Sequence, residues 1–125
     1  MNLLLDTHIL LWWLAEPRKL SRAVFRAIES PENMVFVSSI SIWEMQLKSA
    51  RGKLRFPDDL EKTLARNHFQ ELPLRIAHVQ GLAQILGRNS DPFDRILAAQ
   101  AKVEKLTFVS HDSQAGEMGV HVLIT

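Results

Sequence analysis

Short apolar segments alternate with longer segments of helical periodicity along the whole chain. The apolar segments are typical of strands buried on both faces of a parallel sheet, and we expect them at 3–5, 34–37, 69–72, 107–109 and 120–124. Apolar residues spaced three and four apart, with Pro or Gly near the ends, predict helices at 8–15, 21–30, 39–50, 57–67, 76–86 and 92–105. Strands that alternate with helices in this way predict an α/β fold with three layers (α/β/α) around a mainly parallel central sheet.

The composition fits one globular domain over residues 1–125. Hydrophobic residues make up 46% of the chain and charged residues 23%, which excludes a disordered or fibrous protein. Cysteine is absent, so disulfides, a thiol nucleophile and thiolate-bound zinc are also excluded. The first residues show neither a basic region nor a cleavage site, and no apolar run is long enough to cross a membrane. We therefore expect a cytoplasmic protein without a membrane partner.

The net charge of +1 means that any attraction for nucleic acid has to come from a local patch. The densest basic stretch consists of Lys48, Arg51, Lys53 and Arg55. These side chains could contact RNA phosphates, but a solvated surface explains them as well, and we favour that interpretation.

Acidic residues stand close to the points where the predicted strands end. Asp6 directly follows the first strand, Glu44 lies in the first turn of the helix after the second, and Asp112 lies just beyond 107–109. Asp91 and Asp94 open a long helix that starts at the same edge if it runs antiparallel to the strands. Ligands of parallel sheets bind outside the carboxyl ends of the strands, so this edge is where we expect the chemistry.

Each acid taken alone also has a structural explanation. Asp6 could cap the following helix, and Asp112 could cap a short turn. The segment from Ser41 to Glu44 has the form of a capping box, and Asp91 followed by Pro at 92 is typical of a helix N-cap.

The acids as a set point to a metal ion. Carboxylates crowded at one edge repel one another, and desolvation makes their ionisation costlier. A hard divalent cation relieves that repulsion, and oxygen ligands with room for water suit Mg²⁺ or Mn²⁺. Such an ion can activate a water and clamp a phosphodiester.

Four segments occur in an order that is familiar from one family: LLLDTH at 3–8, SSISIWE at 38–44, DPFDRILAAQA at 91–101 and VSHD at 109–112. Together they resemble the PIN-domain ribonucleases, and especially the VapC toxins of bacterial and archaeal toxin–antitoxin modules. The resemblance runs over essentially the whole chain.

The resemblance implies a compact α/β/α domain and a Mg²⁺- or Mn²⁺-dependent endoribonuclease that leaves a 5′-phosphate and a 3′-hydroxyl. The catalytic and metal-binding acids would be Asp6, Glu44, Asp94 and Asp112, with Asp6 and Asp94 as the main metal ligands. Asp94 ranks above Asp91 because it matches the family element D-x-x-[LI]-A-A. The resemblance further implies an RNA substrate, a homodimer and a cognate antitoxin protein.

Several polar side chains adjoin these acids and could support the site. They are Thr7, Ser39, Asp91 and Ser110. Thr7 and Ser39 could bind a water or phosphate, although a helix cap is the simpler interpretation for them and for Asp91. Ser110 stands where relatives often carry Thr, and Arg88-Asn89-Ser90 stands where they often carry His.

Other residues near the acids are open to more than one interpretation. His8 and His111 are expected to hydrogen-bond an acid or to be exposed, rather than to ligate metal. Arg95 could pair with an acid, contact RNA phosphate or be solvated. One of the adjacent Trp12 and Trp13 is expected in the core and the other in an exposed patch for a partner. Trp43 is expected in the core rather than as a platform for a base.

Two further functions remain open at this point. The first is a catalytically silent PIN-like module that binds RNA or protein, which the presence of all four acids argues against. The second is a receiver-type phosphoacceptor domain. It fits poorly, because that chemistry needs an Asp at the end of a central strand, and 34–37 is followed by two serines.

Overall fold

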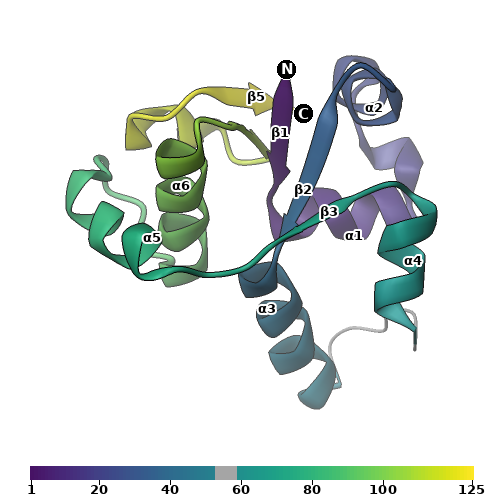
Figure 1. The fold of residues 1–125 in the computed structure, drawn as a ribbon, viewed down its shortest axis with the longest axis horizontal. Helices are drawn as coiled ribbons and strands as arrows, with labels where there is room; N and C mark the ends of the chain where they lie inside the picture. Colours follow the sequence, from purple (N-terminus) through teal and green to yellow (C-terminus); the bar gives the residue numbers. More distant parts are fainter. Residues whose placement is uncertain (53–58) are drawn as a thin grey trace.

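The computed structural model describes residues 1–52 and 59–125, and in this part of the chain five strands form one sheet (Figure 1). The strands are β1 (Asn2–Leu5), β2 (Met34–Ser38), β3 (Gln70–Leu72), β4 (Thr107–Ser110) and β5 (Val122–Ile124). They lie in the order β3-β2-β1-β4-β5, and every neighbouring pair is parallel. The predicted parallel sheet is confirmed.

Helices connect the strands and cover both faces of the sheet. The α-helices are α1 (Thr7–Ala15), α2 (Arg22–Glu29), α3 (Ser39–Ala50), α4 (Leu60–Arg66), α5 (Ile76–Gly81) and α6 (Pro92–Glu104). Short 3₁₀ turns are η1 (Pro17–Lys19), η2 (Leu82–Gln84) and η3 (Ser113–Met118).

Two hydrophobic clusters, one on each face of the sheet, make the fold three-layered. Leu3 and Leu5 of β1 face the cluster that includes residues of α1 and α2, whereas Leu4 faces the cluster built on α6. The alternation follows from the strand period of two residues, and all three leucines are fully buried. Figure 1 shows α5 and α6 on one side of the sheet and α1, α2 and α4 on the other, so the predicted α/β/α architecture is confirmed.

Two predicted helices differ from those observed. The helix expected at 76–86 ends as α5 at Gly81 and continues only as η2 to Gln84. Gly81 lies against α6, where a Cβ atom would approach Val103 Cγ2 to 3.0 Å, and Ile85 then leaves the helix to enter the core. The helix expected at 57–67 begins at Leu60 after an Asp59 cap, and the predicted start at Pro57 lies outside the described residues.

The strand order fixes where a ligand could bind. β1 lies between β2 and β4. After β1 the chain forms β2 and β3 towards one edge of the sheet, and it later returns to form β4 and β5 towards the opposite edge. The backbone N–H of Asp6 extends the pairing by donating to the carbonyl of Val109 at 2.9 Å. The carboxyl ends of β1 and β4 form the topological switch point, which is the usual ligand site of such sheets.

Candidate functional site

Asp6 lies at the switch point with both carboxylate oxygens in polar contact. It caps α1, as predicted, because Oδ1 accepts a hydrogen bond from the N–H of Ile9 at 2.9 Å. Oδ2 accepts from Nδ1 of His111 at 3.4 Å. The side chain is 2% exposed, so these contacts hold the carboxylate in a fixed orientation at the end of β1.

Asp91 and Asp94 open α6 in different roles. Oδ1 of Asp91 accepts from the backbone N–H groups of Phe93 and Asp94 at 2.8 and 3.3 Å, which confirms the predicted N-cap. Pro92 occupies the first helical turn, where its missing N–H has no consequence. Asp94 lies one turn further along, so its carboxylate remains available to a ligand.

Asp112 confirms the predicted cap of a short turn and lines the same cavity as Asp94. Its Oδ1 accepts from the N–H of Gln114 at 2.8 Å, and its own N–H donates to the hydroxyl of Ser110 at 3.0 Å. Ser110 thus orients the segment that carries Asp112.

Asn89 joins two of these acids and is the residue that the sequence analysis missed. Its Nδ2 lies 3.2 Å from Oδ2 of Asp94 and 3.5 Å from Oδ2 of Asp112. Its Oδ1 accepts from the N–H of Asp91 at 2.9 Å. No motif marks Asn89; its position just before the acids is the only signal that could have suggested it.

Arg95 pairs with no acid in the described part of the chain and is not merely solvated, while its contact with RNA phosphate stays a prediction. Its guanidinium donates to the carbonyls of Ile85 at 2.7 Å and Asn89 at 2.9 Å, with longer contacts to two carbonyls between them. Arg95 therefore holds the loop that presents Asn89.

Glu44 reaches the site from α3, but not through the predicted capping box. Ser38 is the N-cap of α3 and accepts from the N–H of Ile40 at 3.0 Å, so Glu44 is the sixth residue of the helix rather than part of its first turn. Ser41 is buried inside the helix, where its hydroxyl accepts from that of Thr7 at 3.1 Å. Glu44 is 8% exposed and pairs with Lys48 at 3.3 Å.

Thr7 and Ser39 do not cap helices either. Thr7 is almost fully buried and ties α1 to α3 through Ser41. The hydroxyl of Ser39 accepts from the N–H of Leu74 at 3.2 Å. Both hydroxyls therefore join elements that surround the site.

Three of the four predicted catalytic acids, Glu44, Asp94 and Asp112, line one cavity of about 390 Å³. It is lined by His8, Glu44, Asp91, Asp94, His111, Asp112 and Ser113. Asp6 does not line it, but contacts His111, which does.

The crowding of acids changes the ionisation of Asp94. Burial raises the pKa of its carboxyl to about 6, against a hydrogen bond from Asn89 that lowers it. The neighbouring charges of Asp91, Asp6 and Glu44 make smaller contributions to this increase in the pKa. A positive charge placed among these groups would therefore be strongly favoured.

Two histidines and a tryptophan stand beside the acids. The hydrogen bond with Asp6 raises the pKa of His111, whereas burial and the neighbouring His111 lower the pKa of His8. The two imidazole rings lie 4.4 Å apart, and Trp12 meets His111 edge-on at 5.4 Å. The expected hydrogen bond between a histidine and an acid is present at His111.

The tryptophans differ from their predicted places. Trp12 and Trp13 are both half-buried, because Trp12 packs on the histidines and Trp13 on Phe25 at 5.0 Å. Trp43, expected in the core, is 57% exposed, since α3 projects beyond the edge of the sheet and turns this position outward.

Part of the basic stretch faces the site. Lys48 and Arg51 line a groove together with Glu44 and Asp91, so they face the edge that carries the acids, as contact with RNA phosphates would require. Arg51 is also exposed, and both interpretations of the basic stretch stay predictions. Lys53 and Arg55 lie outside the described residues.

The fold and the cavity define an all-parallel α/β protein with carboxylates gathered at the switch point of its sheet. Comparison with known families identifies it more closely: residues 3–120 match the PIN domain, and the chain belongs to that family. Membership in this family also disfavours the receiver-type alternative.

A curated relative and several solved structures are similar to this chain. Ribonuclease VapC22 of Mycobacterium tuberculosis is 44% identical over 44 residues, and the match spans 35% of this chain and 33% of that protein. The fold resembles VapBC2 from Rickettsia felis bound to a promoter DNA fragment, with a TM-score of 0.76, 16% identity and coverage of 99% and 98% of the two chains.

Two further structures have the same fold. VapBC-1 from nontypeable Haemophilus influenzae has a TM-score of 0.69 at 17% identity, covering 99% and 98% of the two chains. FitAcB from Neisseria gonorrhoeae has a TM-score of 0.66 at 23% identity, covering 97% and 96%. Among the helices of residues 1–52 and 59–125, none combines the length and apolarity needed to span a bilayer.

Proposed function

We propose that this PIN-domain protein is a divalent-metal-dependent endoribonuclease and the toxin of a toxin–antitoxin pair. The observation that carries the proposal is the convergence of Glu44, Asp94 and Asp112 on one cavity, with Asp6 held beside it. The partial match to Ribonuclease VapC22 supports the same activity.

The donor set fits Mg²⁺ or Mn²⁺. Glu44, Asp94 and Asp112 line one cavity, but within the described residues no group of three His, Asp or Glu side chains is placed closely enough to hold a metal ion by itself. Mg²⁺ usually keeps several of its waters and takes one or two carboxylates, so an open arrangement suits it. Oδ2 of Asp94 and Oδ2 of Asp112 both approach one amide donor of Asn89, which shows that the two oxygens point toward a shared electropositive group.

Asp6 and Asp94 would hold the ion, and Glu44 and Asp112 would contact it directly or through waters. The ion would supply an activated water and neutralise charge on the phosphate. Asp6 keeps its orientation through Ile9 and His111, while Asn89 aligns the carboxylates of Asp94 and Asp112. Hydrolysis would leave a 5′-phosphate and a 3′-hydroxyl.

The proposed partners are RNA, a second copy of the chain and an antitoxin protein. The similar structures from Rickettsia felis and Haemophilus influenzae are VapBC complexes, which supports an antitoxin for this chain as well. We place the activity in the cytoplasm, where RNA substrates are found.

Cleavage of mixed cellular RNA by the purified protein tests this function. We expect discrete fragments with Mg²⁺ or Mn²⁺, none with EDTA and none with Asp94→Asn. Asp91→Asn is the matched control, because Asn caps a helix as well as Asp does and this variant removes an equal charge nearby. Cleavage that survives both EDTA and Asp94→Asn would contradict the proposal, and metal binding without cleavage of any RNA would favour the silent module.

A further inference from the structure

A second groove adjoins the acidic cavity. It has a volume of about 540 Å³, and Glu44 and Asp91 belong to the walls of both. Its remaining walls are Leu47, Lys48, Arg51, Asn89, Ser90, Pro92 and Phe93. A chain bound across the acids would therefore continue directly into this groove.

An aromatic pair includes one wall residue of this groove, Phe93, and the exposed Trp43. The rings of Trp43 and Phe93 meet edge-on, with their centroids 5.2 Å apart. Each ring directly precedes one of the acids in the sequence, Trp43 before Glu44 and Phe93 before Asp94. Phe93 is partly buried, but Trp43 is 57% exposed, so more than half of this aromatic residue is accessible to solvent.

Positive charge lies further along the same helix. Trp43 and Leu47 lie four residues apart on one side of α3, and Arg51 follows as the C-cap residue of this helix. Arg51 makes no ion pair with any side chain in the part of the chain that the structure describes. Lys48, one turn beyond Glu44, lines the groove as well.

Aromatic faces next to cations are the combination that binds single-stranded nucleic acid. Bases stack on the rings, and the phosphates follow the positive charge. Bases of a duplex are already stacked on one another, so such a platform selects single-stranded segments. Stacking reads no hydrogen-bonding edge of the base and therefore tolerates different sequences.

We propose that Trp43 is the stacking platform for a nucleotide next to the scissile phosphate of single-stranded RNA. Phe93 supports the indole ring, and Arg51 and Lys48 receive the following phosphates. The continuity of the groove with the acidic cavity and the presence of Lys48 and Arg51 in its walls favour RNA over a protein partner. This inference rests on the proposed ribonuclease function.

Binding of a fluorescent single-stranded RNA of about 12 nucleotides, measured by anisotropy in EDTA, tests the platform without cleavage. We expect Trp43→Ala to weaken binding by roughly 5- to 150-fold, whereas Trp43→Phe keeps it within about threefold because a ring remains. We expect Arg51→Ala to weaken binding and to reduce the slope of log affinity against log salt by about one. Ile76→Ala is the matched control, because Ile76 is 79% exposed on α5 and lines neither cavity.

Metal-dependent cleavage by the same proteins separates the two proposals. If the wild type cleaves RNA but Trp43→Ala binds RNA as tightly as the wild type, the platform is wrong and the ribonuclease stands. If Trp43→Ala keeps its affinity but elutes as a smaller species, Trp43 belongs to a protein interface, which also overturns the platform. A wild type that neither binds nor cleaves RNA overturns both.

Discussion

At the scale of single residues, the candidate site is a set of carboxylates whose repulsion is only partly relieved. One amide, that of Asn89, approaches both Asp94 and Asp112, and one imidazole, that of His111, approaches Asp6. Lys48 pairs with Glu44. The pKa of the Asp94 carboxyl is raised to about 6, mainly by burial and to a smaller extent by the charges of neighbouring acids.

The pKa of Asp94 makes the metal-free protein less stable as the pH rises. The folded state holds the proton up to about pH 6, whereas the unfolded chain loses it near 3.8, so stability falls as the pH rises through this window. We expect Asp94→Asn to raise the Tm in EDTA by roughly 2–4 °C at neutral pH and to leave the Tm unchanged near pH 4. Thermal denaturation followed by circular dichroism measures both values; a Tm of Asp94→Asn below that of the wild type at neutral pH would contradict the account.

The acids were predictable from the sequence because they follow strand ends and carry the family's motifs, whereas their partners were not. The path of the 85–91 loop determines the positions of Asn89 and of the carbonyls that Arg95 contacts. The direction in which α3 leaves the sheet determines the exposure of Trp43. No local pattern encodes that path. Ser41 is a second example of a local pattern that misled the prediction. The segment from Ser41 to Glu44 has the spacing of a capping box, but α3 begins earlier, with the buried Ser38 as its N-cap.

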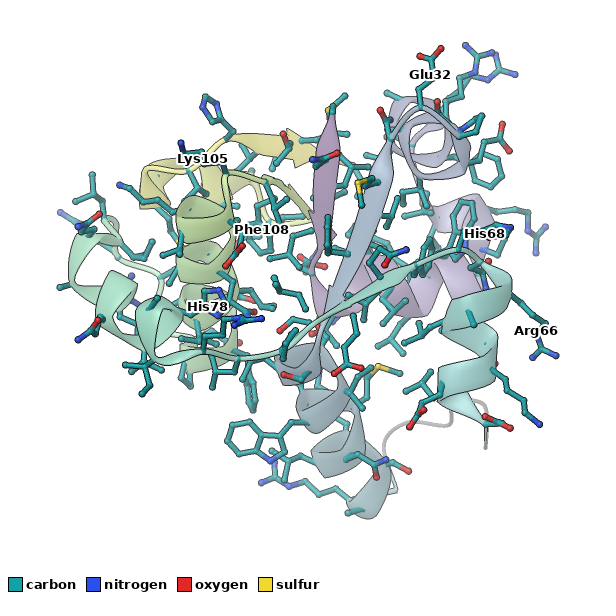
Figure 2. All side chains as sticks on the ribbon, in the orientation of Figure 1. Glu32, Arg66, His68, His78, Lys105 and Phe108 are labelled. Atoms are coloured by element: carbon teal, nitrogen blue, oxygen red, sulfur yellow. The ribbon has the colours of Figure 1, made fainter. Side chains whose placement is uncertain are left out.

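At the scale of elements, α3 and α6 bring the acids to the edge of the sheet, and their ends are held by specific contacts. Ser38 caps α3, and its hydroxyl donates to Oε1 of Gln100 on α6 at 2.5 Å. Gln100 in turn contacts the buried His78, which pairs with Glu104 at 2.7 Å. Figure 2 shows His78 where α5 meets α6. The network joins the two helices that carry Glu44 and Asp94.

Removal of the Ser38 hydroxyl should destabilise the fold. Ser38→Ala loses the helix cap and leaves Oε1 of the buried Gln100 without this donor, so we expect a loss of about 2–3 kcal/mol in the free energy of unfolding. Urea denaturation measures it. Ser39→Ala is the matched control at the neighbouring position and should lose no more than about 1 kcal/mol. Equal losses in the two variants would show that Ser38 is not the cap.

A substitution at the C-terminal end of α6 should instead increase the stability of the fold. Lys105 has φ +58° in the left-handed conformation that glycine adopts without strain. We expect Lys105→Gly to stabilise the protein by about 0.5–1 kcal/mol and Lys102→Gly, inside the helix, to destabilise it by about 1 kcal/mol. The Tm of both variants tests this, and a loss of stability in Lys105→Gly would refute the left-handed cap.

At the scale of the whole molecule, the parallel order β3-β2-β1-β4-β5 is what turns scattered acids into one site. Strands far apart in the sequence end at the same edge, and α6 starts there because it returns antiparallel to them. The alternation of strands and helices predicted this architecture. The length of α5 depended on a tertiary contact, that of Gly81 with α6, and was predicted less well.

Manganese binding tests the central claim most directly, because it needs no knowledge of the RNA substrate. Titration of the purified protein with Mn²⁺, followed by electron paramagnetic resonance of the free ion, gives the affinity. We expect the wild type and Asp91→Asn to bind Mn²⁺ with dissociation constants within about threefold of each other, and Asp6→Asn and Asp94→Asn to bind at least about tenfold more weakly. Equal binding by the wild type and Asp94→Asn, or no binding by the wild type, would contradict the metal site and the ribonuclease mechanism built on it.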